Sequence, residues 1–492
     1  MPCLIAAPCS GSGKTLLSLA LAAVARQRGL RLQPFKVGPD YLDPQLLSRV
    51  SGLACRNLDP LLCGEDWVER SFHWHGSRAE LVLVEGVMGL FDGLGSGTEG
   101  SSAAVAAQLD LPVVLVVEAS RQAGSVAALV KGFRDHALTC LPRPVLLAGV
   151  VLNRVSSQRH RQLLAEALAS IGMPLLGVIP PTPLLDLPSR HLGLHPAHEL
   201  QDLPERQAGW ATLAREHLDL DRLWPLLAPP LPPSDPRHPI PWRLGQQQTG
   251  AAAPLPMAVA SDAAFHFRYP EAAEFLDALG IEPLPWSPLA DQPLPPDCRG
   301  VLLPGGYPEL HAGQLAASRV SLESLRRAAS RGSPIVAECG GLLLLGESLV
   351  DPEGVPHAMA GLLPFRASKG DLSLGYRQAT ACADGLLVRR GEVVPAHEFH
   401  RWQLQPSAPV PGRSVVGRER LWQVEGWGVA SRIEGWTALN VHASWLHLHW
   451  AGCPEIPSRL AAACGRVVPP QTSDVSCWPV NPVSSPQASA GV

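Results

Sequence analysis

The sequence of 492 residues lacks several features that mark particular classes of protein. It has no run of 18 uninterrupted apolar residues, so we expect no membrane span. The eleven cysteines contain no Cys-x-x-Cys pair, which argues against structural zinc and a disulfide framework and favours a reduced, cytoplasmic setting. The net charge of −4 gives no sign of a nucleic-acid-binding surface. The apolar N-terminus also lacks the basic leader of a secretory signal peptide.

What is present is a composition with 46% hydrophobic residues, enough for a substantial core, in a length that predicts two to four domains. Short runs of Val, Leu and Ile alternate with helical stretches, which predicts an α/β protein with two doubly wound domains, the first built on a parallel sheet. The expected strands are residues 32–36, 81–85, 112–117, 145–152 and 175–179 in the first domain, and 257–260, 301–303 and 334–337 in the second.

The stretch that organises the first domain is a glycine-rich turn, Pro8–Thr15. It follows a short apolar run, Cys3–Ala7, and leads into leucines and alanines at helical spacing, Leu16–Arg28. Strand, glycine-rich turn and helix in this order predict a phosphate-binding loop, because backbone N–H groups and the helix N-terminus face the phosphate oxygens. A turn without a ligand is the alternative, since Pro8 stands where the usual pattern has its first glycine. The residues expected to bind ATP are Gly11, Ser12, Gly13, Lys14 and Thr15, with the Thr15 hydroxyl on Mg²⁺.

Acidic side chains follow two of the expected strands at their carboxyl ends, where ligands bind in such folds. The first group is Lys36–Pro44, which contains Asp40 and Asp43, and the second begins at Glu85 and continues into glycines. These residues predict a magnesium–phosphate site, with solvated loop charges as the alternative. Weaker candidates are Asn153-Arg154, for contact with the base or a substrate carboxylate, and the polar clusters Arg56–Asp59 and Ser189–His191, which we expect to be surface loops.

In the second domain a cysteine, Cys339, stands between an expected strand and a helix that opens with Gly340-Gly341. This arrangement predicts a nucleophile elbow, in which the helix N-terminus lowers the pKa of the thiol. The N–H of Gly340 and one from Gly305-Gly306 are the expected oxyanion donors. The base is expected among the histidines of Val441–Trp450. A buried core cysteine and a metal-binding histidine cluster are the alternatives.

A proline-rich stretch separates the two halves. We therefore expect an ATP-binding domain over 1–225, an extended linker over 226–256, a second domain over 257–466 and a disordered tail over 467–492.

Three motifs of the second half, Pro304–Glu309, Glu338–Gly341 and Ser444–His447, resemble the class I glutamine amidotransferase domain. The first half resembles the dethiobiotin-synthetase-like ATP domain through its glycine-rich turn, Lys36–Pro44, Glu85-Gly86 and Arg190–Leu194. Together they resemble the cobyrinate a,c-diamide synthase family across nearly the whole chain, and Lys36–Pro44 is the discriminating motif.

The resemblance implies an enzyme that uses ATP, Mg²⁺ and L-glutamine to amidate cobyrinic acid through an acyl phosphate, with no nucleic-acid or membrane partner. Cys339 is implied to be the glutaminase nucleophile and His447 its base; His449 stands where related enzymes have a glutamate, which implies a Cys–His dyad. The residues implied to handle metal, phosphoryl transfer or substrate are Thr15, Lys36, Asp40, Tyr41, Leu42, Asp43 and Glu85. The rivals are hydrogenobyrinate or nickel-sirohydrochlorin as substrate, and a regulatory P-loop ATPase. The oligomeric state stays open.

Overall fold

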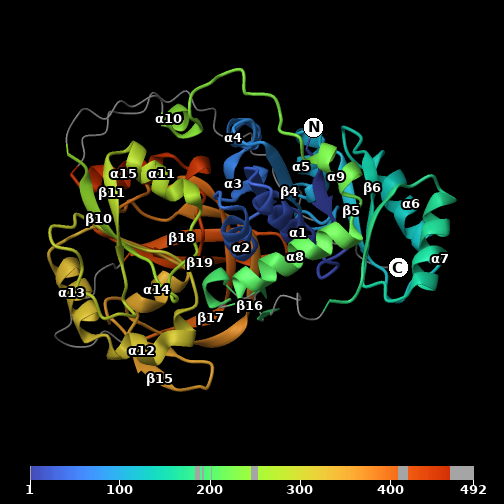
Figure 1. Ribbon diagram of the computed structural model, residues 1–492. Helices are drawn as coiled ribbons and strands as arrows, with labels where there is room; N and C mark the ends of the chain where they lie inside the picture. Colours follow the sequence, from blue (N-terminus) through green and yellow to red (C-terminus); the bar gives the residue numbers. More distant parts are fainter. Residues whose placement is uncertain are drawn as a thin grey trace, which may run out of the picture.

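The computed structural model describes residues 2–182, 189–190, 193–194, 196–200, 202–244, 253–407 and 419–465. These residues form two α/β domains that lie side by side (Figure 1). The predicted fold class is confirmed. The predicted tail lies outside the described residues.

The N-terminal sheet has seven parallel strands in the order β3-β2-β4-β1-β5-β6-β7, which places β1 at the centre. The strands are β1 Leu4–Ala6, β2 Leu32–Val37, β3 Arg56–Leu58, β4 Leu81–Glu85, β5 Val113–Glu118, β6 Leu147–Asn153 and β7 Leu175–Ile179. The helices are α1 Lys14–Gln27, α2 Leu42–Ser51, α3 Pro60–Cys63, α4 Glu65–Gly76, α5 Ser102–Gln108, α6 Ser125–Ala137, α7 Gln158–Ala169, α8 Leu203–His217 and α9 Leu220–Leu223. Helices α1, α2 and α8 pack in an apolar cluster on one face of the sheet. Helices α4, α5, α6 and α7 pack in another cluster on the opposite face. Burial on both faces explains why these strands are continuous apolar runs.

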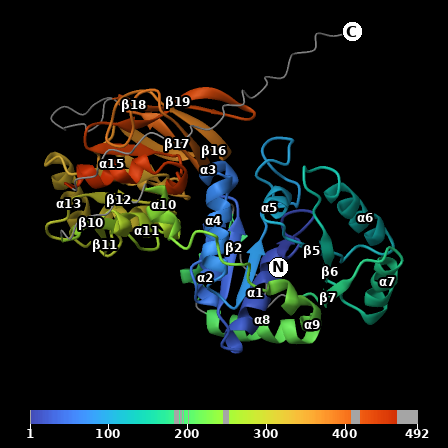
Figure 2. The same ribbon diagram turned by 90° about the horizontal axis from the view of Figure 1, so that it is seen from above.

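One prediction for this domain was wrong. Arg56–Asp59 is not a surface loop: Arg56–Leu58 is the edge strand β3, and Asp59 caps α3 by accepting hydrogen bonds from two backbone N–H groups. All four residues are buried, because the second domain covers this edge. Figure 2 shows α3 beside β16 and β17 of the second domain.

The C-terminal sheet is mixed, in the order β11-β10-β12-β13-β20-β19-β18-β16-β14-β15, with β17 also paired to β16. In this order, strands β11 to β20 are parallel, and the remaining pairs are antiparallel except β14 with β16. Its strands are β10 Leu255–Ala260, β11 Ile281–Trp286, β12 Val301–Leu303, β13 Ile335–Glu338, β14 Ser348–Val350, β15 Pro356–Ala358, β16 Phe365–Ala381, β17 Val393–Pro406, β18 Glu419–Gly426, β19 Val429–Thr437 and β20 Val441–Ser444. The helices are α11 Pro270–Ala278, α12 Ala312–Ala317, α13 Arg319–Ser330, α14 Gly340–Leu345 and α15 Glu455–Ala463. Helices α11 and α15 pack in one apolar cluster and α12 to α14 in another, so both faces are covered.

The remaining short elements connect these layers. They are the hairpin β8 Ser189–Arg190 and β9 Gly193–Leu194, the helix α10 Pro239–Arg243, and the 3-10 turns η2 Ala197–Glu199, η3 Trp224–Leu227, η4 Pro308–His311 and η5 Trp450–Gly452. The proline-rich stretch is not uniformly extended as predicted, because α10 forms within it and buries Ile240 against the second domain. No helix among the described residues is long and apolar enough to cross a membrane.

Candidate active site

The glycine-rich turn has the backbone that its sequence predicts. Gly11 and Gly13 have φ of +78° and +108°, and the turn leads directly into α1. A Cβ on Gly13 would lie 2.3 Å from Nδ2 of Asn153, which itself donates a hydrogen bond of 3.0 Å to the Ser12 carbonyl oxygen. Asn153 therefore buttresses the turn from the end of β6.

The predicted acidic residues gather around Lys36. Strands β2 and β4 are neighbours and pair Lys36 with Glu85 in register, which brings two distant motifs together. The Lys36 Nζ lies 2.5 Å from Asp43, 2.8 Å from Glu85 and 3.7 Å from Asp40. Burial alone would lower the pKa of Lys36, but these three carboxylates raise it well above its usual value. The pKa of Asp40 is raised to about 7 by burial and by the charge of Asp43.

The same cluster reaches the turn through Glu85. The hydroxyl of Thr15 donates a hydrogen bond of 2.8 Å to Oε1 of Glu85, while Oε2 of Glu85 is buried without a hydrogen-bond partner. A hydroxyl and a free carboxylate oxygen side by side suit Mg²⁺, which takes few protein ligands when it also binds phosphate oxygens and water. The residues present therefore fit a nucleotide-bound Mg²⁺, although no group of three or more His, Cys, Asp or Glu in the described ranges forms a ready-made metal cage.

In the second domain the predicted elbow is present. Cys339 has φ of +48° and ψ of −112° between β13 and α14, a backbone conformation that costs free energy and holds the residue at a sharp strand-to-helix turn. A Cβ on Gly340 would lie 2.9 Å from the Gly306 nitrogen, and one on Gly341 would lie 2.1 Å from the Leu303 carbonyl oxygen. Glycine is thus required where α14 approaches β12 and the predicted oxyanion loop.

Of the three candidate histidines, the structure brings His447 to the elbow. The backbone of His447 exchanges two hydrogen bonds with His397 of β17, and two residues further along β17 the Phe399 carbonyl oxygen lies 3.7 Å from the Cys339 Sγ. A Cβ on Gly305 would lie 2.7 Å from Cε1 of His447. Cys339 and His447 therefore both lie against β17, and His447 also approaches the glycine loop at Gly305.

The other two histidines face different surroundings. His442 lies in the core with its ring 5.8 Å from that of Trp422, and His449 faces the domain interface, with Nε2 at 3.7 Å from Glu271. The three histidines do not converge on a common point, so they do not form the metal cluster that was the alternative.

The expected direction of the Cys339 pKa was wrong. Burial is the main cause that raises the pKa of this thiol, and the nearby carboxylate of Glu309 raises it further. Helix α14 has only six residues, and its N-terminal field does not offset the loss of solvent. Burial also lowers the pKa of His447 to about 3. The pair is therefore a neutral thiol beside a neutral imidazole at pH 7.

The two sites meet at an aromatic cluster that sequence reasoning missed. Tyr41, on the loop that carries Asp40 and Asp43, stacks on Phe267 with ring centroids 5.3 Å apart and lies 5.1 Å from the ring of His447. Nothing in the sequence pattern pairs these residues, which come from separate domains.

A small cavity of about 20 Å³ adjoins this cluster, lined among others by Tyr41, Tyr269, Glu338 and His449. It has room for about one water-sized molecule. Glu338 directly precedes Cys339 in the chain. The cavity therefore lies between the two groups of predicted residues.

Two further interactions fasten the domains beside the cavity. Arg56 of β3 lies 3.3 Å from Glu271 and 2.5 Å from Glu274 on α11, and the hydroxyl of Tyr376 donates a hydrogen bond of 3.0 Å to Asp59. Each interaction joins the edge of the first sheet to the second domain.

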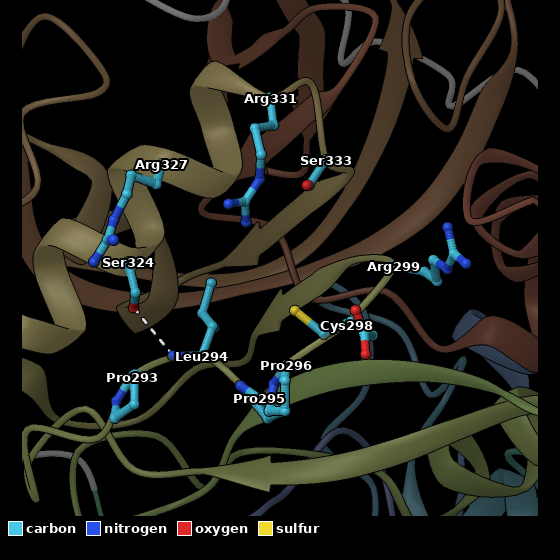
Figure 3. Close-up of a pocket in the computed structure, with 11 residues that line it drawn as sticks. Pro293, Leu294, Pro295, Pro296, Cys298, Arg299, Ser324, Arg327, Arg331 and Ser333 are labelled. Carbon is cyan, nitrogen blue, oxygen red and sulfur yellow. Dashed lines mark hydrogen bonds between the residues drawn. The ribbon is translucent and has the colours of Figure 1, made fainter.

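A larger hollow of about 440 Å³ lies elsewhere in the second domain, between the segment before β12 and helix α13 (Figure 3). Arg327, Arg331 and the prolines 293, 295 and 296 line it, and the backbone N–H of Leu294 donates a hydrogen bond of 3.1 Å to Ser324 across its edge. None of the predicted site residues lines it, so its size does not make it the active site. The predicted motif Arg190–Leu194 lies largely outside the described residues.

Comparisons with known proteins agree with this division of the chain. Residues 3–194 match the model of the CobQ/CobB/MinD/ParA nucleotide binding domain, and residues 256–454 match that of the CobB/CobQ-like glutamine amidotransferase domain.

Similar proteins extend over nearly the full length. The cobyrinate a,c-diamide synthase of Gloeobacter violaceus is 45% identical, over 94% of this chain and 97% of its own. That of Salmonella typhimurium is 38% identical, over 93% and 97%. The hydrogenobyrinate a,c-diamide synthase of Streptomyces coelicolor is 39% identical, over 94% and 96%. With both domain models matched and relatives of this similarity covering both halves, the chain belongs to the cobyrinate a,c-diamide synthase family.

Proposed function

We propose that the chain catalyses the ATP- and glutamine-dependent amidation of the a and c acetate carboxylates of cobyrinate, the reaction for which its relatives are named. The observation that carries the proposal is the meeting of two sites at one interface. The loop with Asp40 and Asp43 continues through Tyr41 to the ring of His447, so a phosphate-binding site and a thiol–imidazole pair share a boundary.

In the first site, a substrate carboxylate attacks the γ-phosphorus of ATP and gives an acyl phosphate and ADP. Lys14 and the N–H groups of the glycine-rich turn hold the phosphates, and the protonated Lys36 offsets the charges of Asp43 and Glu85. Thr15 and Glu85, with Asp40 as the further candidate ligand, would hold Mg²⁺, which would neutralise charge on the phosphoryl group. Tyr41 and Leu42, at the start of α2, belong to the same loop, but their side chains are buried in the aromatic cluster between the domains.

In the second site, the neutral His447 accepts the thiol proton as the Cys339 sulfur attacks the side-chain carbonyl of glutamine. The N–H groups of Gly340 and of the Gly305-Gly306 loop stabilise the oxyanion. The nitrogen leaves as ammonia with the proton from His447, and water then hydrolyses the thioester to glutamate. Because both groups are neutral at rest, proton transfer accompanies the attack.

Ammonia must reach the acyl phosphate without meeting bulk water, which would protonate it and compete for the acyl group. The cavity of about 20 Å³ between Glu338 and Tyr41 supports an enclosed route, since these two residues directly adjoin Cys339 and Asp40 in the chain. Burial raises the pKa of Glu338 to about 8, so at pH 7 the Glu338 side chain that lines the cavity is mainly uncharged. The ionised Glu271 on the same cavity is paired with Arg56.

The macrocycle needs an apolar surface near the phosphate site. Met88, in the loop after β4, is 45% exposed, and Trp427, at the tip between β18 and β19, is 62% exposed. A Cβ on Gly95 of that loop would lie 2.7 Å from the indole nitrogen of Trp427, so the two domains come together here as well. We place the macrocycle face against these side chains.

The experiment that tests the proposal is an amidation assay with ATP, Mg²⁺ and cobyrinate, with glutamine or ammonium as nitrogen source and mass analysis of the product. Wild type should add two amides with either source, Cys339→Ala only with ammonium, and the control Cys140→Ala with both. Cys140 is a free cysteine just after α6 in the N-terminal domain. Glutamine-dependent amidation by Cys339→Ala would refute the assignment of the nucleophile.

Hydrogenobyrinate is the second candidate substrate, because relatives of similar identity carry that name. The same assay should be run with both macrocycles. A kcat/KM for hydrogenobyrinate that exceeds that for cobyrinate would overturn the choice of substrate and leave the chemistry intact.

A further inference from the structure

Tyr41 comes from the synthetase domain, yet its ring contacts the base of the glutaminase domain. It precedes α2, between Asp40 and Leu42, and is only 9% exposed. Its ring centroid lies 5.1 Å from that of His447, with 47° between the planes. A phosphate-site loop thus ends against the imidazole of the other site.

Among the residues that the structure describes, no carboxylate orients the imidazole of His447. Its Nδ1 is buried and has no hydrogen-bond partner, and His449, two residues on, faces Glu271 instead. The orientation of the His447 ring therefore depends on packing, and the groups that pack on it are Tyr41 and the backbone of Gly305.

Tyr41 is itself held firmly by the second domain. Phe267 stacks on it with 10° between the planes, and the ring of Tyr269 lies 4.7 Å away. The N–H of Phe267 donates a hydrogen bond of 3.0 Å to the carbonyl oxygen of Gly305, the same residue that approaches His447. Tyr41, Phe267 and Gly305 therefore form one continuous packing around the base.

We propose that Tyr41 is a positioning residue for His447, so that the synthetase domain completes the glutaminase site. The proposal rests on the roles proposed above for Cys339 and His447. Without the Tyr41 ring, the imidazole gains freedom to turn away from the thiol, and small misplacements of a catalytic group cost large factors in rate. Ammonia is therefore released efficiently only while the synthetase domain, which carries the acceptor site, is packed against the glutaminase domain.

The test is glutamine hydrolysis in the full chain without ATP or macrocycle, followed as glutamate release. Tyr41→Leu should lower kcat about tenfold or more and change KM less than about threefold, because the ring contacts the base and not the substrate. Tyr41→Phe keeps the ring and should stay within about twofold of wild type. Phe267→Leu removes the support from the other domain and should lower kcat in the same direction.

Gln45→Ala is the matched control, since it removes two domain-spanning hydrogen bonds from the Gln45 Nε2, one of 3.0 Å to the His266 carbonyl oxygen and one of 3.2 Å to the His266 ring, while the rings of Tyr41 and Phe267 stay in place. It should leave kcat within about twofold. Wild-type kcat in Tyr41→Leu and Phe267→Leu, or an equal loss in Tyr41→Phe or Gln45→Ala, would overturn the positioning role. If wild type releases no glutamate, or Cys339→Ala still does, the proposed glutaminase fails and the inference with it.

Discussion

The buried ion pair between Arg56 and Glu271 should be one of the strongest single contributions to the domain interface. Arg56 has a side chain only 9% exposed and Glu271 only 1%. Burial alone would raise the pKa of Glu271, but the charges of Arg56 and His449 lower it from 4.5 to about 2. A lowering of this size corresponds to about 3 kcal/mol of stabilisation at pH 7. Removal of one partner of a buried pair costs about 3–5 kcal/mol, in agreement.

We therefore expect Arg56→Met to destabilise the folded chain by about 3 kcal/mol at pH 7, measured by urea unfolding with tryptophan fluorescence. The pH dependence follows from the sign of the shift. Because the pKa of Glu271 is lower in the folded state, its stabilisation is present above about pH 4.5 and is lost as the pH falls towards about 2. The difference between wild type and variant should shrink over that window.

Two comparisons make this result decisive. Arg222→Met removes an exposed pair, with Asp219 at 3.8 Å, and should cost less than about 1 kcal/mol. The double variant Arg56→Met/Glu271→Met removes both deeply buried charges and should recover most of the loss, since only Glu274, whose side chain is 30% exposed, is left without its partner. If Arg56→Met costs no more than Arg222→Met, the pair does not hold the interface.

Three further predictions concern the two sites and the packing around them. Lys36→Met leaves three carboxylates without their counter-charge and should lower ammonium-dependent amidation about 100-fold or more, while glutamine hydrolysis without ATP changes less than about twofold. Asn153→Ala removes the hydrogen bond to the phosphate loop and should raise the KM for ATP about fivefold, read from initial rates; an unchanged KM would contradict the buttressing role. Gly341→Ala places a Cβ 2.1 Å from a backbone oxygen of β12 and should cost about 2 kcal/mol or more by urea unfolding, whereas Gly132→Ala, with open space inside α6, should stabilise by about 0.5–1 kcal/mol. Equal effects of the two alanines would show that the close approach at α14 is tolerated.

The interface between the two domains fixes the position of one site relative to the other. The first sheet's edge strand β3 and the loop before α2 form part of its contact with the second domain, so the carboxylates of the phosphate site and the elbow are held at fixed separation. Arg56, Asp59 and Gln45 supply polar contacts around the aromatic cluster. A site shared in this way suits a reaction that must pass a small neutral molecule from one domain to the other.

The sequence by itself determined the local elements of the chemistry. Gly11 and Gly13, Cys339 with its two glycines, and the acids that follow β2 and β4 were all recognised because each lies in a short pattern with its own strand and helix. Backbone conformation of this kind depends on neighbours in the chain: only glycine takes the positive φ of Gly13 readily. The parallel order of the strands then predicted that Lys36 and Glu85 lie at one edge, and the register confirms it.

Only the tertiary structure decided the rest. Arg56 was expected in a surface loop, because a short polar strand that another domain covers has no periodic signal of its own. The Cys339 pKa was expected to fall, because helix position can be read locally whereas burial cannot. The contact of Tyr41 with His447 joins residues from two domains, and no pattern in either stretch encodes the other. Distance along the chain says nothing about such contacts, since packing of whole domains sets which side chains meet.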